Sequence, residues 1–241
     1  MKKLLLGLLL ISSVLSFGAT QRVNIEKLVT NESRDTLYLE ETKKPYSGEV
    51  ERKYPDGKLL GLATVKDGKF NGKSYEYYEN GKLKIEENYV NGKSEGVSKV
   101  FYPNGKVKYE TPYKNDKKEG VEKFYSENGI LMSEIPFKND VVIGVAKVYN
   151  AQTGKLEYEE NLVNGKRNGL SKKYYPSGKV LNEVNFKDDK EEGIMRVYYE
   201  TGKLQGEIPY KNGEVDGVVK AYDENGKLIE QATFKNGEEV K

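Results

Sequence analysis

Residues 96–113 read Gly-Val-Ser-Lys-Val-Phe-Tyr-Pro-Asn-Gly-Lys-Val-Lys-Tyr-Glu-Thr-Pro-Tyr, with runs of alternating polar and apolar residues on both sides of Asn104-Gly105. Alternation with a period of two is typical of a β-strand with one buried face. Asn-Gly between two such runs predicts a β-hairpin, because both residues accept the positive φ of a type I′ turn. The stretch therefore predicts two short antiparallel strands joined by a tight turn.

A two-residue turn fixes the register of this hairpin. It places Tyr102 opposite Val107 and Lys99 opposite Glu110, so one face is aromatic and aliphatic and the other carries opposed charges. Directly opposed unlike charges stabilise a sheet by about 0.2–1 kcal/mol per pair. The same pairing recurs at Lys123 and Glu134, Lys147 and Glu159, Lys172 and Glu183, and Arg196 and Glu207. This recurrence favours the same register in every unit.

The hairpin is one unit of a tandem array. Its first glycine recurs at intervals of 24 residues, apart from one interval of 25. These anchor glycines are Gly48, Gly72, Gly96, Gly120, Gly144, Gly169, Gly193 and Gly217. The long interval has one extra residue within the segment Asn150–Gly154. A fixed period of this kind indicates a repeat architecture.

The sequence therefore predicts an all-β protein, a single elongated and twisted antiparallel β-meander of about eight tandem hairpins at residues 48–241. Residues 20–47 are expected to form a capping hairpin from Val23–Val29 and Thr36–Glu40, since terminal units of repeat arrays are commonly atypical. Open sheets of more than about ten strands tend to curl or split. We therefore expect curvature of the sheet to enclose part of the aromatic face.

Residues 1–19 have the pattern of a secretory signal peptide. Lys2 and Lys3 precede the apolar run Leu4–Phe17, and small residues follow it. This run of 14 residues is shorter than the roughly 20 that a spanning helix needs. We expect an exported chain that is periplasmic, on the cell surface or secreted, and whose mature part has no transmembrane anchor. Association with a membrane surface stays open.

The composition argues against catalysis and metal binding. The chain contains no histidine and no cysteine, which removes the commonest general base, thiol nucleophiles and the usual zinc ligands. We expect no enzymatic activity, no catalytic residues, no metal and no cofactor. Basic residues number 40 and acidic residues 38, and two of the lysines lie in the predicted leader, so no net field attracts nucleic acid.

The segments Tyr54–Leu59 and Tyr102–Val107 read Tyr-Pro-Asp-Gly-Lys-Leu and Tyr-Pro-Asn-Gly-Lys-Val, and Asn-Gly-Lys turns lie between them. This pattern resembles the bacterial variant of the MORN repeat, a family that also carries the label of YwqK-type antitoxins. The resemblance extends from Thr36 to the C-terminus. It implies an array of β-hairpins that serves as a scaffold for protein contact or membrane association, and the label implies an antitoxin-like function.

Aromatic residues at two adjacent positions of the repeat are the candidate contact residues. One position is expected to pack between units and holds Tyr54, Tyr78, Tyr102, Tyr175 and Tyr199. The preceding position falls on the charged face and forms a candidate binding stripe of Tyr77, Phe101, Tyr125, Tyr149, Tyr174, Tyr198 and Tyr222. Aromatic side chains supply much of the contact energy in protein interfaces. The alternative is that these rings only cover neighbouring aliphatic residues.

The sequence thus favours an exported, non-enzymatic repeat scaffold that binds a protein or a component of the cell surface or envelope. The first alternative is an exported glycan-binding or carboxylate-dependent carbohydrate-active protein. Glutamates on every second strand would lie about 9.6 Å apart, similar to the carboxylates of some glycosidases. The second alternative is an antitoxin-like or immunity-like protein.

Export can be tested on the native protein. Mass spectrometry should give an N-terminus near Ala19 or Thr20, because signal peptidase removes the leader. Finding the intact Met1 on protein in the cytoplasm would contradict export.

Overall fold

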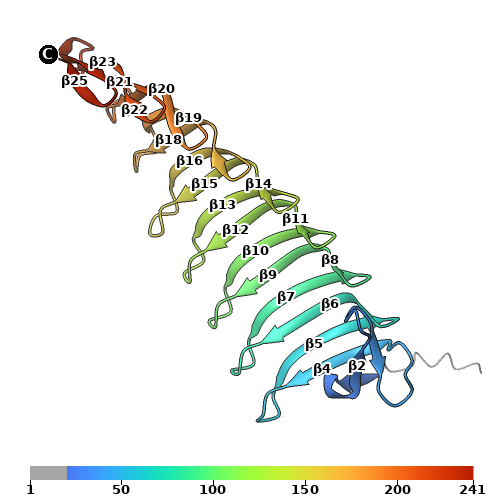
Figure 1. Ribbon diagram of the computed structural model, residues 1–241. Helices are drawn as coiled ribbons and strands as arrows, with labels where there is room; N and C mark the ends of the chain where they lie inside the picture. The colour runs from blue at the N-terminus through green and yellow to red at the C-terminus, as the bar shows by residue number, and fades with distance from the viewer. Residues whose placement is uncertain (1–20, 241) are drawn as a thin grey trace, which may run out of the picture.

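The computed structural model describes residues 21–240, so the predicted signal peptide at residues 1–19 lies outside the described range. The chain is built almost wholly of β-strands, arranged as a long twisted array of hairpins (Figure 1). Within residues 21–240 the only helical element is the 3-10 turn η1 (Ile25–Lys27). No helix in this range is long and apolar enough to cross a membrane. The predicted all-β, elongated fold is confirmed.

Each repeat contributes two long strands. The first strands are β4 (Gly48–Lys53), β6 (Lys69–Tyr77), β9 (Gly96–Phe101), β12 (Gly120–Tyr125), β15 (Gly144–Tyr149), β18 (Gly169–Tyr174), β20 (Lys190–Tyr198) and β23 (Gly217–Tyr222). The second strands are β5 (Leu59–Lys66), β7 (Leu83–Val90), β10 (Val107–Lys114), β13 (Leu131–Lys138), β16 (Leu156–Val163), β19 (Val180–Lys187), β21 (Leu204–Lys211) and β24 (Leu228–Lys235). Shorter strands follow the second strands at β8 (Lys93–Ser94), β11 (Lys117–Lys118), β14 (Val141–Val142), β17 (Lys166–Arg167), β22 (Glu214–Val215) and β25 (Glu238–Val240).

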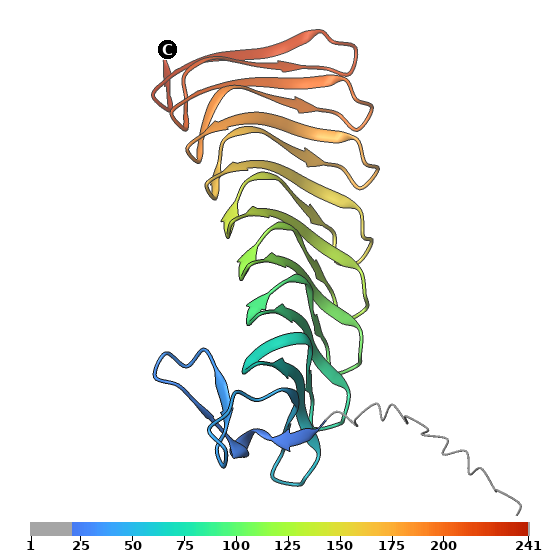
Figure 2. The ribbon, with the colours of Figure 1, turned by 90° about the vertical axis from the view of Figure 1, so that its right-hand side faces the viewer.

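These strands form one sheet of 23 strands that also includes β1 (Arg22–Asn24). From β4 onward each long strand pairs antiparallel with the next long strand, and the short strands pair with the long strand before them, so the repeats form a meander. The exception is β1, which pairs parallel with β4 at the first edge. Figure 2 shows the hairpins side by side along the long axis, each of them bent rather than flat.

The turn inside each hairpin differs from the expected two-residue type I′ turn. Gly105 has a φ of 93°, but Asn104 does not have a positive φ. The N–H of Gly105 donates to the carbonyl of Tyr102, and the N–H of Tyr102 donates to the carbonyl of Lys106, each at 2.8 Å. This is a three-residue loop, a type I turn followed by a left-handed glycine, and it places a β-bulge in the second strand.

The bulge changes the pairing next to the turn and preserves it beyond. Val107 lies opposite Phe101, so the predicted pairing of Tyr102 with Val107 is wrong. Lys99 lies opposite Glu110, as predicted. The same shift recurs in the other hairpins, which is why the charge pairs keep one register throughout.

Type I′ geometry occurs instead in the junction turns, which connect one hairpin to the next. Asn91 and Gly92 have φ values of 50° and 83°, and Asn115 and Asp116 have 50° and 68°. Asparagine and aspartate accept left-handed backbone more readily than other side chains. The tight turn of the array is therefore the one between repeats.

The sheet bends at the anchor glycines. β10 pairs with β11 in one register and with β12 in a register two residues away. Gly120 lies at this irregularity with a φ of 120°, and the N–H of Glu119 donates to the carbonyl of Pro112. In an antiparallel sheet the N–H and the carbonyl of one residue face the same neighbouring strand. Pro112 lacks an N–H, and this gap falls where the register changes, so no regular backbone hydrogen bond is lost. Proline is therefore tolerated inside the sheet.

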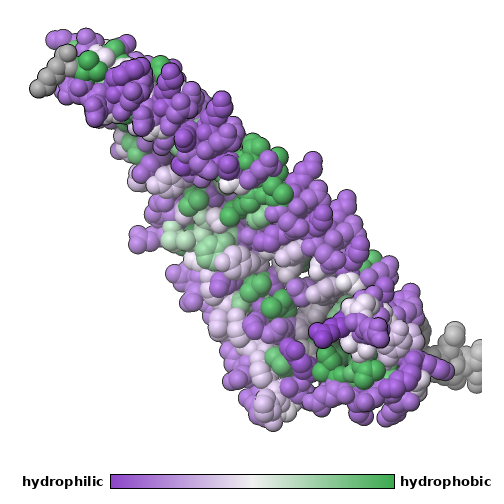
Figure 3. Space-filling model, in the orientation of Figure 1, coloured by the Kyte–Doolittle hydropathy of each residue, from purple (hydrophilic) through white to green (hydrophobic). Residues whose placement is uncertain are grey.

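The two faces of the sheet differ in burial. The most buried residues of the repeats all lie on one face, which we call the inner face, and these are Val50, Ala63, Val65, Thr111, Ser171, Val184 and Phe186. Tyr109 and Phe124 stack on this face with ring centroids 4.9 Å apart. We call the opposite face, which carries Lys99 and Glu110, the ladder face. Figure 3 shows that hydrophobic surface forms separate patches along the molecule, divided by hydrophilic side chains.

The segment before the first repeat covers the first edge of the sheet. β2 (Leu28–Thr30) and β3 (Leu37–Leu39) form a small separate hairpin. The expected hairpin between Val23–Val29 and Thr36–Glu40 is thus limited to these two strands, because η1 divides the first segment. A small core joins this cap to the repeats through Val23, Tyr46, Val50 and Val65.

The bend can be tested with Gly120→Ala and a matched control, Gly96→Ala. Both glycines have a left-handed φ, so alanine at either position should lower the free energy of unfolding by about 1–2 kcal/mol. A Cβ on Gly96 meets nothing within 4 Å, whereas one on Gly120 lies 2.9 Å from Cγ of Pro112. Urea denaturation should therefore show a further loss of about 1–3 kcal/mol for Gly120→Ala. Equal losses in the two variants would mean that the proline contact does not constrain the bend.

Candidate functional site

A row of alternating charges crosses the ladder face. Glu86 lies opposite Lys99, Lys99 opposite Glu110, and Glu110 opposite Lys123, so each charge inside the row faces an opposite charge on both sides. The ion pairs within repeats are Lys99–Glu110 at 2.9 Å, Lys123–Glu134 at 3.8 Å, Lys147–Glu159 at 3.5 Å, Lys172–Glu183 at 3.9 Å and Arg196–Glu207 at 4.0 Å. The predicted charge ladder is confirmed, and its alternation leaves no net field on this face.

The candidate binding stripe runs beside this ladder, and all seven of its residues are half-buried. Five of its tyrosines donate their hydroxyl to the ladder glutamate of the preceding repeat: Tyr125 to Glu110 at 3.1 Å, Tyr149 to Glu134 at 2.8 Å, Tyr174 to Glu159 at 2.6 Å, Tyr198 to Glu183 at 2.8 Å and Tyr222 to Glu207 at 3.1 Å. The other two stripe residues do not make this bond. Phe101 has no hydroxyl, and the residue 15 positions before Tyr77 is Leu62 instead of a glutamate. Sequence reasoning missed these bonds, although their constant spacing of 15 residues was visible.

Burial and these hydrogen bonds hold the stripe tyrosines in their neutral form. Burial, followed by the hydrogen bond to Glu159, raises the pKa of Tyr174 to about 12. Burial and the bond to Glu134 do the same for Tyr149. The carboxylates of the ladder from Glu110 to Glu207 thus form an ion pair with a lysine or arginine and accept a hydrogen bond from a tyrosine, which favours a structural role over that of an acid poised for catalysis.

The second aromatic position ties the repeats together through the backbone. Its tyrosine hydroxyls donate to carbonyls of the next repeat: Tyr54 to Tyr77 at 2.7 Å, Tyr78 to Phe101 at 2.6 Å, Tyr102 to Tyr125 at 2.8 Å, Tyr175 to Tyr198 at 2.8 Å and Tyr199 to Tyr222 at 2.8 Å. Each acceptor carbonyl lies just past the last backbone pair between neighbouring repeats, where no strand N–H reaches it. These tyrosines have the packing role expected of them.

A row of aliphatic side chains lies on the other side of the ladder. We call it the aliphatic row, and its members are Val97, Val121, Val145, Ile194 and Val218, exposed by 46, 44, 43, 43 and 40%. Pro112 lies opposite Val97, and Pro136 opposite Val121, which widens the apolar strip. The ladder face therefore presents three parallel rows: half-buried aromatic rings, paired charges and exposed aliphatic groups.

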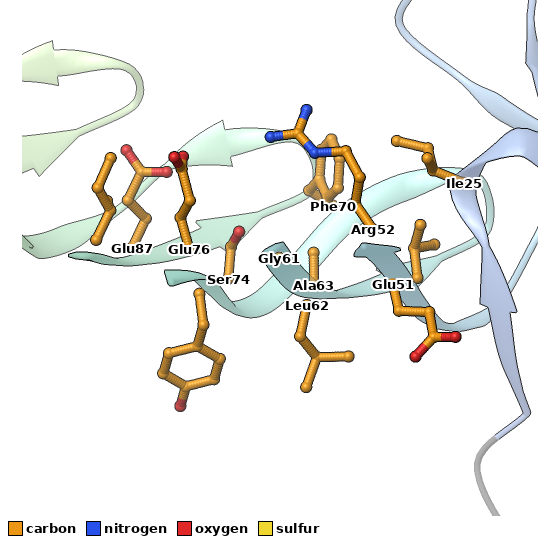
Figure 4. A pocket seen from close by; sticks show the side chains of 13 residues that line it. Ile25, Glu51, Arg52, Gly61, Leu62, Ala63, Phe70, Ser74, Glu76 and Glu87 are labelled. Atoms are coloured by element: carbon orange, nitrogen blue, oxygen red, sulfur yellow. The ribbon is translucent and has the colours of Figure 1, made fainter. Parts of the chain in front are cut away.

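A pocket of about 180 Å³ lies on the inner face at the start of the array (Figure 4). Gly61 and Ala63 form its floor, and a Cβ on Gly61 would make only an ordinary contact, so the glycine serves to leave space. Arg52 extends over the pocket from one side, and Glu76 and Glu87 stand at the other end (Figure 4). The equivalent position holds Ile85, Tyr109, Ser133, Tyr158, Asn182 and Glu230 in six of the later repeats, and Gly206 in the seventh repeat.

The carboxylates of this pocket are already bound. Lys84 Nζ lies 2.6 Å from Glu76, and the hydroxyl of Tyr89 donates to Glu87 at 2.9 Å. Each carboxylate thus has its own partner, so the pair does not form a free acid and base. Within residues 21–240 no cluster of three or more acidic side chains is placed to hold a metal ion.

Comparison with known proteins identifies the repeat unit. A family model described as MORN repeat variant matches seven segments, which together make up more than half of the chain: residues 46–67, 70–91, 94–115, 118–139, 167–188, 191–212 and 215–236. Each segment comprises one hairpin of the array. The hairpin that carries the extra residue lies between the fourth and fifth matches. No curated protein matches the chain.

Tyr174→Phe tests the bond between stripe and ladder, because the ring stays and only the hydroxyl is lost. We expect the free energy of unfolding to fall by about 1–2 kcal/mol near neutral pH. Folding raises the pKa of Tyr174 to about 12 from an ordinary value near 10, so the unfolded chain loses its proton first. The stabilisation is therefore complete below about pH 10 and disappears as the pH rises to about 12.

Denaturation curves of the wild type and of Tyr174→Phe across this range provide the measurement. The difference between the two proteins isolates the tyrosine, since the lysines titrate in both. A difference that persists unchanged above about pH 12 would rule out the hydrogen bond as its source.

Proposed function

Because the chain belongs to the MORN repeat variant family, we propose that it is an exported, non-enzymatic scaffold that binds a partner protein along its ladder face. MORN repeats suggest a repeat scaffold, often for binding, and the family is generally non-catalytic. An elongated sheet with one repeated surface suits a partner that contacts several repeats at once.

The aliphatic row is the observation that carries this proposal. Its five side chains occupy the same position in five of the eight repeats, and nothing within residues 21–240 covers them. Burying exposed apolar area stabilises a complex by about 25 cal/mol per Å² before the costs of association are subtracted. A partner that covers several of these groups gains a contribution from each repeat.

The charges beside the row favour contact over electrostatic attraction. Each ladder glutamate from Glu110 to Glu207 already has a basic partner, so the face offers no unbalanced charge to a distant partner. We therefore expect the affinity to depend weakly on salt concentration. The stripe tyrosines would border the contact as half-buried rings.

Export is supported by the first residues of the sequence. Lys2 and Lys3 followed by the apolar run Leu4–Phe17 fit a cleaved signal peptide, which supports a partner in the periplasm, at the cell surface or outside the cell.

Substitution of the aliphatic row tests the proposed function. Val121→Thr combined with Val145→Thr keeps β-branched side chains and should leave the melting temperature nearly unchanged. Partner captured by the chain from residue 21 onward should bind the double variant at least about tenfold more weakly, which corresponds to about 1.4 kcal/mol. Quantitative pull-down from envelope fractions and from surrounding cells provides the measurement.

The control is Val90→Thr combined with Val163→Thr, two valines beside junction turns with exposures of 47 and 43%. This control should retain the partner. If both double variants bind equally well, the ladder face is not the contact surface.

A further inference from the structure

The fourth, fifth and eighth repeats lack the tyrosine that ties neighbouring repeats together, and the fifth also has a longer loop. The other five repeats have it, and its hydroxyl reaches a carbonyl of the next repeat. The remaining repeats have Ser126, Asn150 and Asp223. Asn150 also begins the loop with the extra residue, so both departures of this repeat fall at one place.

The side chain of Asn150 does not replace the missing ring. Its Oδ1 accepts from the backbone N–H groups of Gln152 and Thr153 at 3.0 and 2.9 Å, and its Nδ2 donates to Glu157 at 2.7 Å. It therefore stabilises its own loop and does not reach the sixth repeat. Within residues 21–240 no side chain donates to the carbonyl of Tyr174, which is the acceptor that a tyrosine at this position would serve.

A cavity of about 370 Å³ lies where that ring is missing. The Asn150–Gly154 loop and Lys155 form one wall, and Tyr175 and Pro176 of the sixth repeat form the other. A cavity of about 150 Å³ accommodates benzene in another protein, so the space is sufficient for a phenol ring.

The lining matches such a ring chemically. Leu156, Leu181 and the ring of Tyr158 supply apolar surface. Lys173 Nζ lies 5.2 Å from the Tyr158 ring centroid, within range of a cation–π contact. In the third repeat, Lys108 Nζ lies 5.4 Å from the ring of Tyr102, and the fifth repeat has Glu157 at the position of Lys108. In the fifth-repeat cavity the cationic groups of the lining are instead Lys155 and Lys173.

We propose that this cavity binds the phenolic side chain of a tyrosine presented by a partner protein. The ring fills the space that Tyr102 fills in its own repeat, and its hydroxyl donates to the carbonyl of Tyr174. The proposed function enters only as the source of the tyrosine; recognition of a phenol follows from the cavity itself. The cavity lining includes Tyr158 and Lys173 of the inner face and Tyr174 of the stripe, so the partner reaches it at the edge of the sheet that carries the Asn150–Gly154 loop.

The test uses p-cresol, the free equivalent of a tyrosine side chain. Titration followed by two-dimensional amide NMR should give saturable shifts at residues 150–155 and 173–176. Toluene, which lacks the hydroxyl, should bind at least about tenfold more weakly because the carbonyl stays unpaired. Absence of saturable shifts, or equal binding of toluene and p-cresol, would overturn the proposal.

A variant that fills the cavity from within provides the second measurement. Asn150→Tyr combined with deletion of Ala151 restores the four-residue spacing of the other repeats. This variant should melt at a higher temperature and lose p-cresol binding, because filling a cavity stabilises a protein and excludes its ligand. Asn150→Tyr alone is the second form if the deletion impairs folding. Unchanged p-cresol binding in the folded variant would place the ligand elsewhere.

The matched control is Ser126→Tyr, which adds the tyrosine one repeat earlier and leaves the Asn150 cavity intact. It should retain p-cresol binding. Failure of p-cresol to bind would refute the cavity proposal alone, whereas failure of the aliphatic-row variants to affect partner capture would refute the proposed contact surface. The two ideas can therefore fail separately.

Discussion

No hairpin in this protein has a core of its own, so each depends on the strands beside it. Within residues 21–240 no large side chain is fully enclosed. What holds the array is contact between neighbours: the backbone ladder, tyrosine hydroxyls on carbonyls, and carboxylates on backbone N–H groups, as when Asp116 accepts from Ser94 at 2.7 Å. Stability in such an array is approximately a sum over units and their interfaces. This explains why the first edge needs β1 and the small core around Val50 and Val65.

The strand register could be predicted from the sequence because it depends on periodicity. The turn type could not, because a two-residue type I′ turn and a three-residue loop with a bulge both fit the Asn-Gly pair. The register of Lys99 with Glu110 follows from alternation alone, and it survives the error in the turn because the bulge lies nearer the tip. The turn itself was misassigned because Asn-Gly suits a type I′ turn in isolation. Pro103 was the contrary signal, since proline favours the second position of a type I turn.

The candidate site shows the same division. The seven stripe residues could be placed on the charged face from their spacing, and the structure puts them there. Their bonds to glutamates could not be derived from pairing within one hairpin, because Tyr174 and Glu159 belong to different repeats. The pocket beside Asn150 depends on a departure from the repeat, whereas Gly61 of the first pocket has a counterpart in Gly206. A period reveals what its units share, whereas the pocket beside Asn150 arises where a unit lacks the tyrosine that five other units have.

The direction of the strands has a mechanical consequence. They run across the long axis, so the backbone hydrogen bonds between strands point along it. A tensile load along the axis therefore pulls each interface open one bond at a time, like a zipper, instead of shearing many bonds together. Units at the ends detach first and the interior stays folded, so the array yields in steps at low force. A partner bound across several units would hold these units together and raise the force needed to separate them. The array would then resist extension most strongly where the partner is bound.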